Sequence, residues 1–137
     1  MQNVRAALVT AFQTVSLGVS STSVCYENET RPTADGPWAE FHFIPGPAKA
    51  VTLGVGGLDL CQGICQININ DQLGNGEALG AAAYSALRDK FVVGTTLIFM
   101  GQSVTVTSCS RSGGHTLNGW YRISITIGWK AYLTRKV

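Results

Sequence analysis

The chain has 137 residues, which is enough for one domain that buries roughly two-thirds of the surface exposed by its unfolded form. Apolar residues make up 45% of the sequence and charged residues only 13%, against about 25% charged in a typical soluble protein. Such a chain folds, but its exterior carries unusually little charge. Coverage of that exterior by other chains would be one physical reason, so the composition favours an oligomer or an assembly component over a free monomer.

The net charge of +2 hides an asymmetry along the chain. Residues 1–89 hold four basic residues against all eight acids, a balance of −4, whereas residues 90–137 hold six basic residues and no acid. Split charge of this kind favours head-to-tail contacts between subunits, or a polar pore or ring, as readily as nucleic acid. A nucleic-acid binder usually clusters its basic residues among stacking aromatics. Here they are scattered: Arg111, Arg122, Lys130, Arg135 and Lys136.

We expect no signal peptide, because the start MQNVRAALVTAFQTV has polar and charged residues at helical intervals rather than a continuous apolar core. No run reaches the roughly 18 apolar residues that a membrane span needs. The sequence therefore predicts a protein that is made and used in a cytoplasm.

Apolar residues recur at helical spacing from Val4 to Val15 and predict an amphipathic helix that Gly18 ends. A short strand is expected around Ser23–Tyr26. The turn-rich stretch NETRPTADGP then leads into a strand over Trp38–Ile44, whose apolar and polar residues alternate.

Residues 38–59, WAEFHFIPGPAKAVTLGVGGLD, form a long, partly apolar segment that is expected to contribute little to the core. Pro45 and Pro47 are expected to break the strand and stiffen its exit, and three glycines downstream let the chain bend. We therefore expect an arm, a projecting hairpin or loop over residues 45–60, that packs on an adjacent subunit or another assembly component. The alternative is an ordinary mobile surface hairpin.

The second half of the chain alternates more regularly. Cys61–Asn70 predicts a strand, and a second helix is expected from 76 to 91 with Asn75 as its N-cap. After Gly94, the segments TTLIFM and SVTVTSCS predict a hairpin, and a glycine-rich loop leads to a last strand that begins near Tyr121.

In the last strand, apolar residues from Tyr121 to Trp129 alternate strictly with polar ones, which is typical of an antiparallel sheet with one buried face. The order of elements predicts a single domain over residues 1–137 of the α+β class. We expect one antiparallel-dominated (mixed) β-sheet with two α-helices packed on one face, plus the projecting hairpin or loop.

The motifs that would carry small-molecule chemistry are weak. The turn in QININDQLGNGEALG matches a dinucleotide fingerprint loosely, and the chain has no acid after Asp89 to bind a ribose. Cys61 and Cys65 lie four residues apart on a strand, roughly 13 Å at the usual rise, which is too far for a disulfide or a shared zinc. We expect free thiols, no metal and no cofactor.

Catalytic constellations are equally weak, so we do not expect an enzyme. His42 and His115 come without a serine elbow, an HExxH motif or a spaced carboxylate pair. Glu40 and His42 share one face of their strand and are expected to form a surface ion pair.

The order and spacing of several segments together resemble one known family. These segments are WxxFxFxPG at 38–46, TLG at 52–54, GIxQIxI at 63–69 and FxxG at 91–94, set between the opening helix and the final long strand. In this respect the chain resembles the tail terminator proteins of long-tailed bacteriophages, the lambda-like terminator group. The resemblance implies an α/β sandwich that assembles as a homo-hexameric ring on the last ring of the tail tube.

The resemblance also implies a structural role at the head–tail junction of the virion, after assembly in the host cytoplasm. Such a ring stops tube polymerisation and offers the attachment surface for the head connector or neck protein, while genomic DNA passes through its channel without specific binding. The family brings no catalytic residues. The alternative readings are a neck or head–tail joining protein of the same phages and, from another class, a small nucleic-acid-binding domain.

The candidate contact residues lie on the arm and in two polar loops, RPTADGPW and SRSGGHTLNGW, each followed by a tryptophan that can anchor it. Arg31 and Arg111 are expected to form ion pairs with acids of a neighbouring subunit. The full set for the subunit or tube interface is Arg31, Trp38, Pro45, Pro47, Lys49, Val51, Leu53, Val55, Leu58, Arg111, His115 and Trp120.

Overall fold

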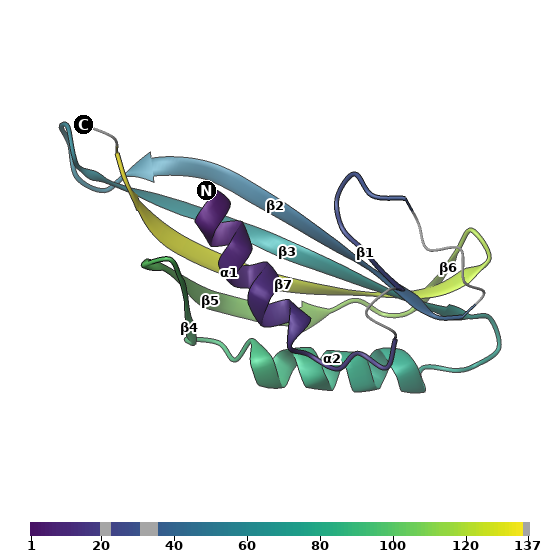
Figure 1. The fold of residues 1–137 in the computed structure, drawn as a ribbon. Helices are drawn as coiled ribbons and strands as arrows, with labels where there is room; N and C mark the ends of the chain where they lie inside the picture. The colour runs from purple at the N-terminus through teal and green to yellow at the C-terminus, as the bar shows by residue number, and fades with distance from the viewer. Residues whose placement is uncertain (20–22, 31–35, 136–137) are drawn as a thin grey trace.

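The computed structural model describes residues 1–19, 23–30 and 36–135 (Figure 1). Two helices and seven strands follow one another along this part of the chain: α1 Gln2–Gln13, β1 Val24–Cys25, β2 Trp38–Ala50, β3 Leu58–Gln72, α2 Ala78–Lys90, β4 Thr96–Phe99, β5 Gln102–Arg111, β6 His115–Leu117 and β7 Trp120–Thr134.

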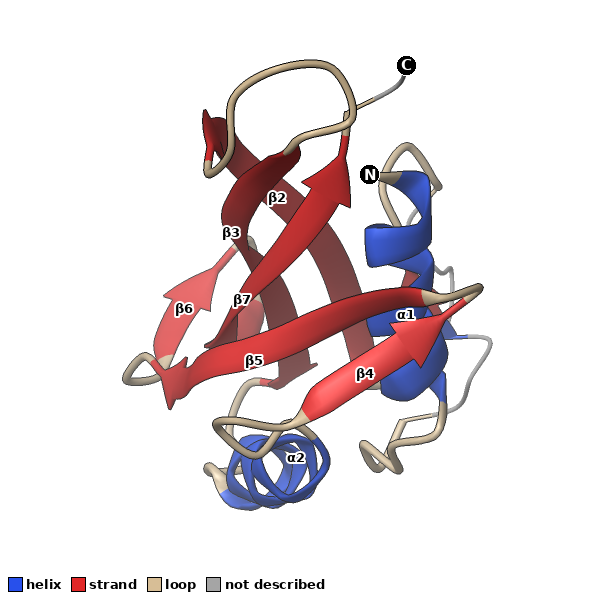
Figure 2. Cartoon of the chain, turned by 90° about the vertical axis from the view of Figure 1, so that its left-hand side faces the viewer, coloured by secondary structure: helices blue, strands red, loops and turns tan. Residues whose placement is uncertain are grey.

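The strands form one sheet in the order β1-β2-β3-β7-β5-β4, and β6 pairs with β7 off this path. The β1–β2 pair is parallel and the other pairs are antiparallel, so the sheet is mixed. Figure 2 shows that the sheet curls, which brings β4 round to α1. The predicted α+β fold, an antiparallel-dominated sheet with two helices, is confirmed.

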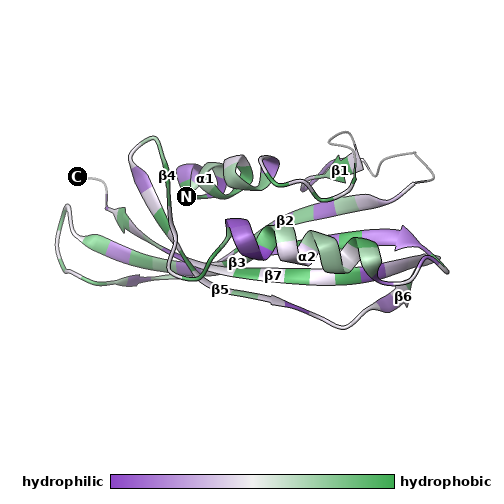
Figure 3. Ribbon diagram, turned by 90° about the horizontal axis from the view of Figure 1, so that it is seen from below, coloured by the Kyte–Doolittle hydropathy of each residue, from purple (hydrophilic) through white to green (hydrophobic). Residues whose placement is uncertain are grey.

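The inner face of the sheet is set by strand register. Residues that lie side by side on β2, β3 and β7 form layers of the core, with one residue from each strand in a layer. The central layer consists of Phe41, Ile67 and Ile125. These three side chains are at most 1% exposed. The banded colouring of β7 in Figure 3 shows the alternation that separates this face from the opposite one.

Both helices bury their apolar sides in the same core. The ring of Phe12 on α1 lies 4.9 Å from that of Phe41, measured between centroids. On α2, Gly80 allows a close approach to the sheet, because a Cβ there would lie 2.1 Å from Ile123 Cδ1. Ala83 and Leu87 follow on the same side of α2 and are fully buried.

The prediction of Asn75 as the N-cap of the second helix is wrong. The N-cap is Glu77, and it makes no side-chain cap hydrogen bond. Gly76 has φ +74°, outside the helical region, so the helix cannot begin as early as the sequence pattern indicated. Asn75 instead donates a side-chain hydrogen bond to Asp71, with Nδ2 and Oδ1 3.3 Å apart.

The prediction that the two prolines break the second strand is also wrong. β2 continues to Ala50, with a bulge in its pairing to β3 between Pro45 and Ala48. β1 pairs only with Ala39 and Glu40, so beyond those residues β2 is the outer strand of the sheet. An edge strand with a bulge tolerates proline, because no ladder hydrogen bond is needed on its open side.

We expect Phe41→Ala to lower the free energy of unfolding by about 3–5 kcal/mol, because it opens a cavity beneath both Phe12 and Tyr26. Leu53→Ala, at a side chain that is 91% exposed, should change it by less than about 0.5 kcal/mol. Urea unfolding followed by tryptophan fluorescence measures both. Equal losses for the two variants would contradict the assignment of core and arm.

Candidate assembly interface

The arm, residues 45–60, is the end of the long β2–β3 hairpin, and the end of β7 pairs with it. β3 has 15 residues and spans roughly 45 Å at a rise of about 3.3 Å per residue. A compact domain of this length has a radius of gyration of about 14 Å and is about 37 Å across as a sphere. The β2–β3 hairpin and the end of β7 therefore extend beyond the body, and Figure 1 shows loop 51–57 and the end of β7 together there.

The tip of the arm is apolar and exposed. We define the arm tip as Val51–Leu58, residues that carry no charge. Leu53 is 91% and Val55 is 78% exposed, and Val51 and Leu58 are exposed as well. Large aliphatic side chains gathered at a protruding end add nothing to the core, and exposed apolar patches of this kind are a common feature of contact surfaces.

Hydrogen bonds give the arm tip a defined shape. The Val51 N–H donates to the carbonyl of Leu58, and the Leu58 N–H donates to Thr52 Oγ1, each over 2.8 Å. Arg135, just after β7, donates its N–H to the carbonyl of Gly57 over 2.9 Å and forms an ion pair with Asp59 at 3.1 Å. The end of β7 thus holds the base of the arm tip, which lowers the ordering cost of a later contact.

The structure brings the predicted arm residues together. Val51, Leu53, Val55 and Leu58 share the tip, and Pro45, Pro47 and Lys49 are exposed along β2. Arg31 lies outside the described residues. The remaining predicted interface residues lie on or beside the opposite end of the strands: Trp38, Arg111, His115 and Trp120.

At that opposite end the two tryptophans pack against each other. Trp38 is 6% exposed, and its ring packs edge-on against Trp120 with centroids 6.1 Å apart. Trp120 is half-buried. The two tryptophans therefore contact each other within the chain. Residues 31–35 of the first loop lie outside the described residues, and a contact of either loop with a second subunit stays a prediction.

Arg111 and His115 lie on the same end. Arg111 Nη2 is 3.7 Å from Glu77 Oε1 of the same chain, and its Nε–H donates to the carbonyl of Ser112. His115 is exposed on β6, within a segment that we expected to be a loop. The segment instead forms the β6–β7 hairpin. Its turn residues Asn118 and Gly119 both have positive φ, as a two-residue turn of the Asn-Gly type requires.

A polar network crosses the sheet face opposite the helices. Arg122 on β7 donates from Nη2 to Glu40 Oε1 over 2.5 Å and from Nε to Asn70 Oδ1 over 2.9 Å. His42 Nε2 lies 3.0 Å from Glu40 Oε2, which confirms the predicted pair. Asn70 is fully buried, so this network satisfies polar groups that water cannot reach. It fixes the relative positions of β2, β3 and β7 at the end opposite the arm.

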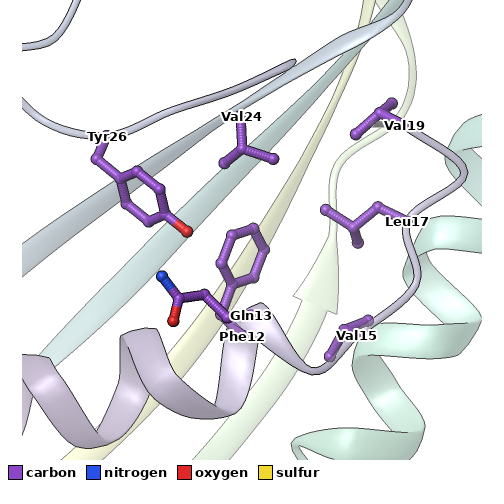
Figure 4. Close-up of a pocket in the computed structure, with 7 residues that line it drawn as sticks. All are labelled: Phe12, Gln13, Val15, Leu17, Val19, Val24 and Tyr26. Atoms are coloured by element: carbon purple, nitrogen blue, oxygen red, sulfur yellow. The ribbon is translucent and has the colours of Figure 1, made fainter. Parts of the chain in front are cut away.

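A pocket and the four cysteines bear on whether the protein could bind a small molecule or a metal ion. A pocket of about 310 Å³ opens between α1 and β1 and is lined mainly by apolar side chains, including Phe12, Leu17 and Val24 (Figure 4). The four cysteines are free thiols, and Cys61 and Cys65 are buried in the core. Within the described residues, no group of three or more His, Cys, Asp or Glu side chains is placed to hold a metal ion, and no helix is long and apolar enough to cross a membrane.

Comparison with known families decides the identity. The family model of phage tail terminator proteins matches residues 3–129. The chain belongs to this family. It is therefore a structural protein of the bacteriophage tail rather than a member of an enzyme family, and its family implies a location in the virion tail and contacts with other tail components.

The chain also shares its fold with solved structures. Eight chains match, and one of them aligns with a TM-score of 0.70 over 93% of this chain and 94% of its own length. The two sequences are 18% identical, so this similarity supports the fold alone. A search of the curated proteins gave no match.

The polar network makes a testable contribution to stability. We expect Arg122→Ala to lower the free energy of unfolding by about 2–3 kcal/mol, because it leaves Glu40 and Asn70 without their shared donor in a largely buried setting. Arg111→Ala, whose ion pair with Glu77 is longer and more exposed, should cost less than about 1 kcal/mol. Chemical unfolding compares the two; similar costs would show that the network adds no more than a surface pair.

Proposed function

We propose that this tail terminator closes the head-proximal end of the tail tube as a homo-hexameric ring, ends tube polymerisation and provides the surface to which the head connector or neck protein attaches. Genomic DNA then passes through the ring without specific binding. The observation that carries the proposal is the family match over residues 3–129, which covers nearly the whole chain.

The arm supports a role in assembly. A side chain such as Leu53 or Val55 gains about 1.5–3 kcal/mol when it moves from water into a full apolar contact. The arm tip exposes several such side chains and holds them in one hydrogen-bonded arrangement. A protein that remained a monomer would gain nothing from this surface.

The distribution of charge supports a ring of identical subunits. Head-to-tail contacts join two different surfaces of one chain, so they tolerate a protein whose two halves differ in sign. The first 89 residues are acidic and the remainder is basic, and part of this difference is already paired within the chain by Arg111–Glu77, Arg122–Glu40 and Arg135–Asp59. The low overall charge is also consistent with a surface that is mostly covered after assembly.

Deletion of residues 47–58 should leave a folded protein that no longer caps tails. The deletion removes the arm tip and the end of β2, and residues 59–62 can close the shortened hairpin. We expect the body to keep its far-ultraviolet circular dichroism and its cooperative unfolding, since the buried residues of β2 end at Phe41. In an infected-cell extract that lacks the terminator, the variant should leave overlong tubes. Unaffected capping would contradict a role for the arm.

A point variant separates the apolar contact from the length of the arm. We expect Leu53→Asp together with Val55→Asp to abolish capping as the deletion does, because two charges replace the most exposed apolar side chains of the arm tip. Leu73→Asp is the matched control, because Leu73 is also an exposed leucine but lies in the loop after β3, away from the arm. Loss of capping in the control as well would point to a general effect of added charge.

A further inference from the structure

Beyond Glu40, β2 forms the longer edge of the sheet within the described residues. It has 13 residues, and β1 pairs with it only at Ala39 and Glu40 (Figure 1). β4, at the other end of the strand order, has four residues, and the curl of the sheet brings it to α1. A long open edge presents backbone N–H and C=O groups with which a strand of another chain can pair.

The side chain of Glu27 covers part of this edge. The N–H of Phe43 points away from β3, because it donates to Glu27 Oε1 rather than to the neighbouring strand. N–H groups two residues apart on a strand point to the same side. The next outward N–H would therefore belong to residue 45, and this residue is a proline, which has none. Glu27 and Pro45 thus remove two successive outward donors from the edge of β2.

Arg5 on α1 holds Glu27 in this position. Glu27 lies in the turn after β1, and its second oxygen, Oε2, accepts a hydrogen bond from Arg5 Nη2 over 2.6 Å. Burial alone would raise the pKa of Glu27, but the hydrogen bonds from Arg5 and from the Phe43 N–H outweigh burial and hold that pKa below its usual range. The carboxylate is therefore ionised at neutral pH. In that form it only accepts hydrogen bonds, which suits it to a backbone N–H.

A side chain also covers the open edge of β7. The pairing of β5 with β7 ends at Thr105 opposite Lys130, so the last residues of β7 have no strand on that side within the described part of the chain. There Gln102 Nε2 donates to the carbonyl of Tyr132 over 3.1 Å. Both long strands at the sides of the arm therefore have a side chain hydrogen-bonded to the backbone of their open edge.

We propose that Glu27 blocks the β2 edge, so that the chain cannot extend its sheet with a strand from a second copy. A charged side chain, a proline and a β-bulge are devices by which natural sheets avoid edge-to-edge pairing, and β2 combines all three at Phe43, Pro45 and the bulge that follows. Pairing of this edge with a different edge of the next copy would be a head-to-tail contact, and such contacts build open filaments when they do not close. The blocked edge leaves assembly to other surfaces of the chain. This inference does not depend on the proposed ring.

Hydrogen–deuterium exchange at Phe43, resolved by mass-spectrometric fragmentation, tests the contact itself. In Glu27→Ala we expect the Phe43 amide to exchange at least about tenfold faster than in the unmodified protein, because it loses its acceptor. Glu27→Gln is the matched control. It loses the ion pair with Arg5 but keeps a side-chain oxygen for the Phe43 N–H, so its exchange should stay close to that of the unmodified protein.

Analytical ultracentrifugation tests the consequence. In Glu27→Ala combined with Pro45→Val, the second change restores an outward donor, so we expect the mass to rise with concentration above that of the unmodified protein. Exchange of the Phe43 amide should then slow again at high concentration, because a second strand covers it. A variant that had only lost stability would associate without this renewed protection.

Three results would overturn the inference. They are unchanged exchange of the Phe43 amide in Glu27→Ala, an unchanged mass of the double variant, and association of the double variant without renewed protection of Phe43. The first of these needs only the single variant, so the test does not depend on the folding of the double variant. None of the three bears on capping of the tail tube, which the arm variants test separately.

Discussion

The pairing of β3 with β7 is the constraint on which the rest of the structure depends. The two strands run antiparallel without a bulge from Leu58 opposite Thr134 to Gln72 opposite Trp120. Because side chains alternate along both strands, this single register decides which residues enter the core and which form the opposite face. A slip of β7 by one residue would turn Ile125 out of the core and draw Arg122 into it.

The same register produces both the polar network and the arm. At one end it stacks Asn70 and Arg122 beside Glu40, which closes the polar network. At the other end it carries both strands past the body of the domain and brings Arg135 to Gly57 and Asp59. The arm is therefore a direct continuation of the central strands, and the core that stabilises the domain also positions its exposed tip.

Local patterns predicted the features that depend on local spacing. The alternation from Ile123 to Trp129 and the helical spacing of Ala83 and Leu87 sufficed for the strand, the helix and their buried faces. The composition of residues 45–60 predicts the arm, because apolar residues next to prolines and glycines do not fit a core strand. Pro45 was misjudged because its tolerance depends on β2 lying at the sheet edge, which is a property of the topology. The Arg122–Glu40 contact joins residues far apart in the sequence, so no local spacing could predict it.

We propose that this protein forms a ring at one end of the tail tube. The most direct test is electron microscopy of purified tubes incubated with gold-labelled terminator, combined with light scattering of the free protein to give its mass in solution. We expect a ring of label at the head-proximal tube end only, whether the free protein is a monomer or already a hexamer. Label on connector rings but not on tubes would contradict it and favour a neck protein.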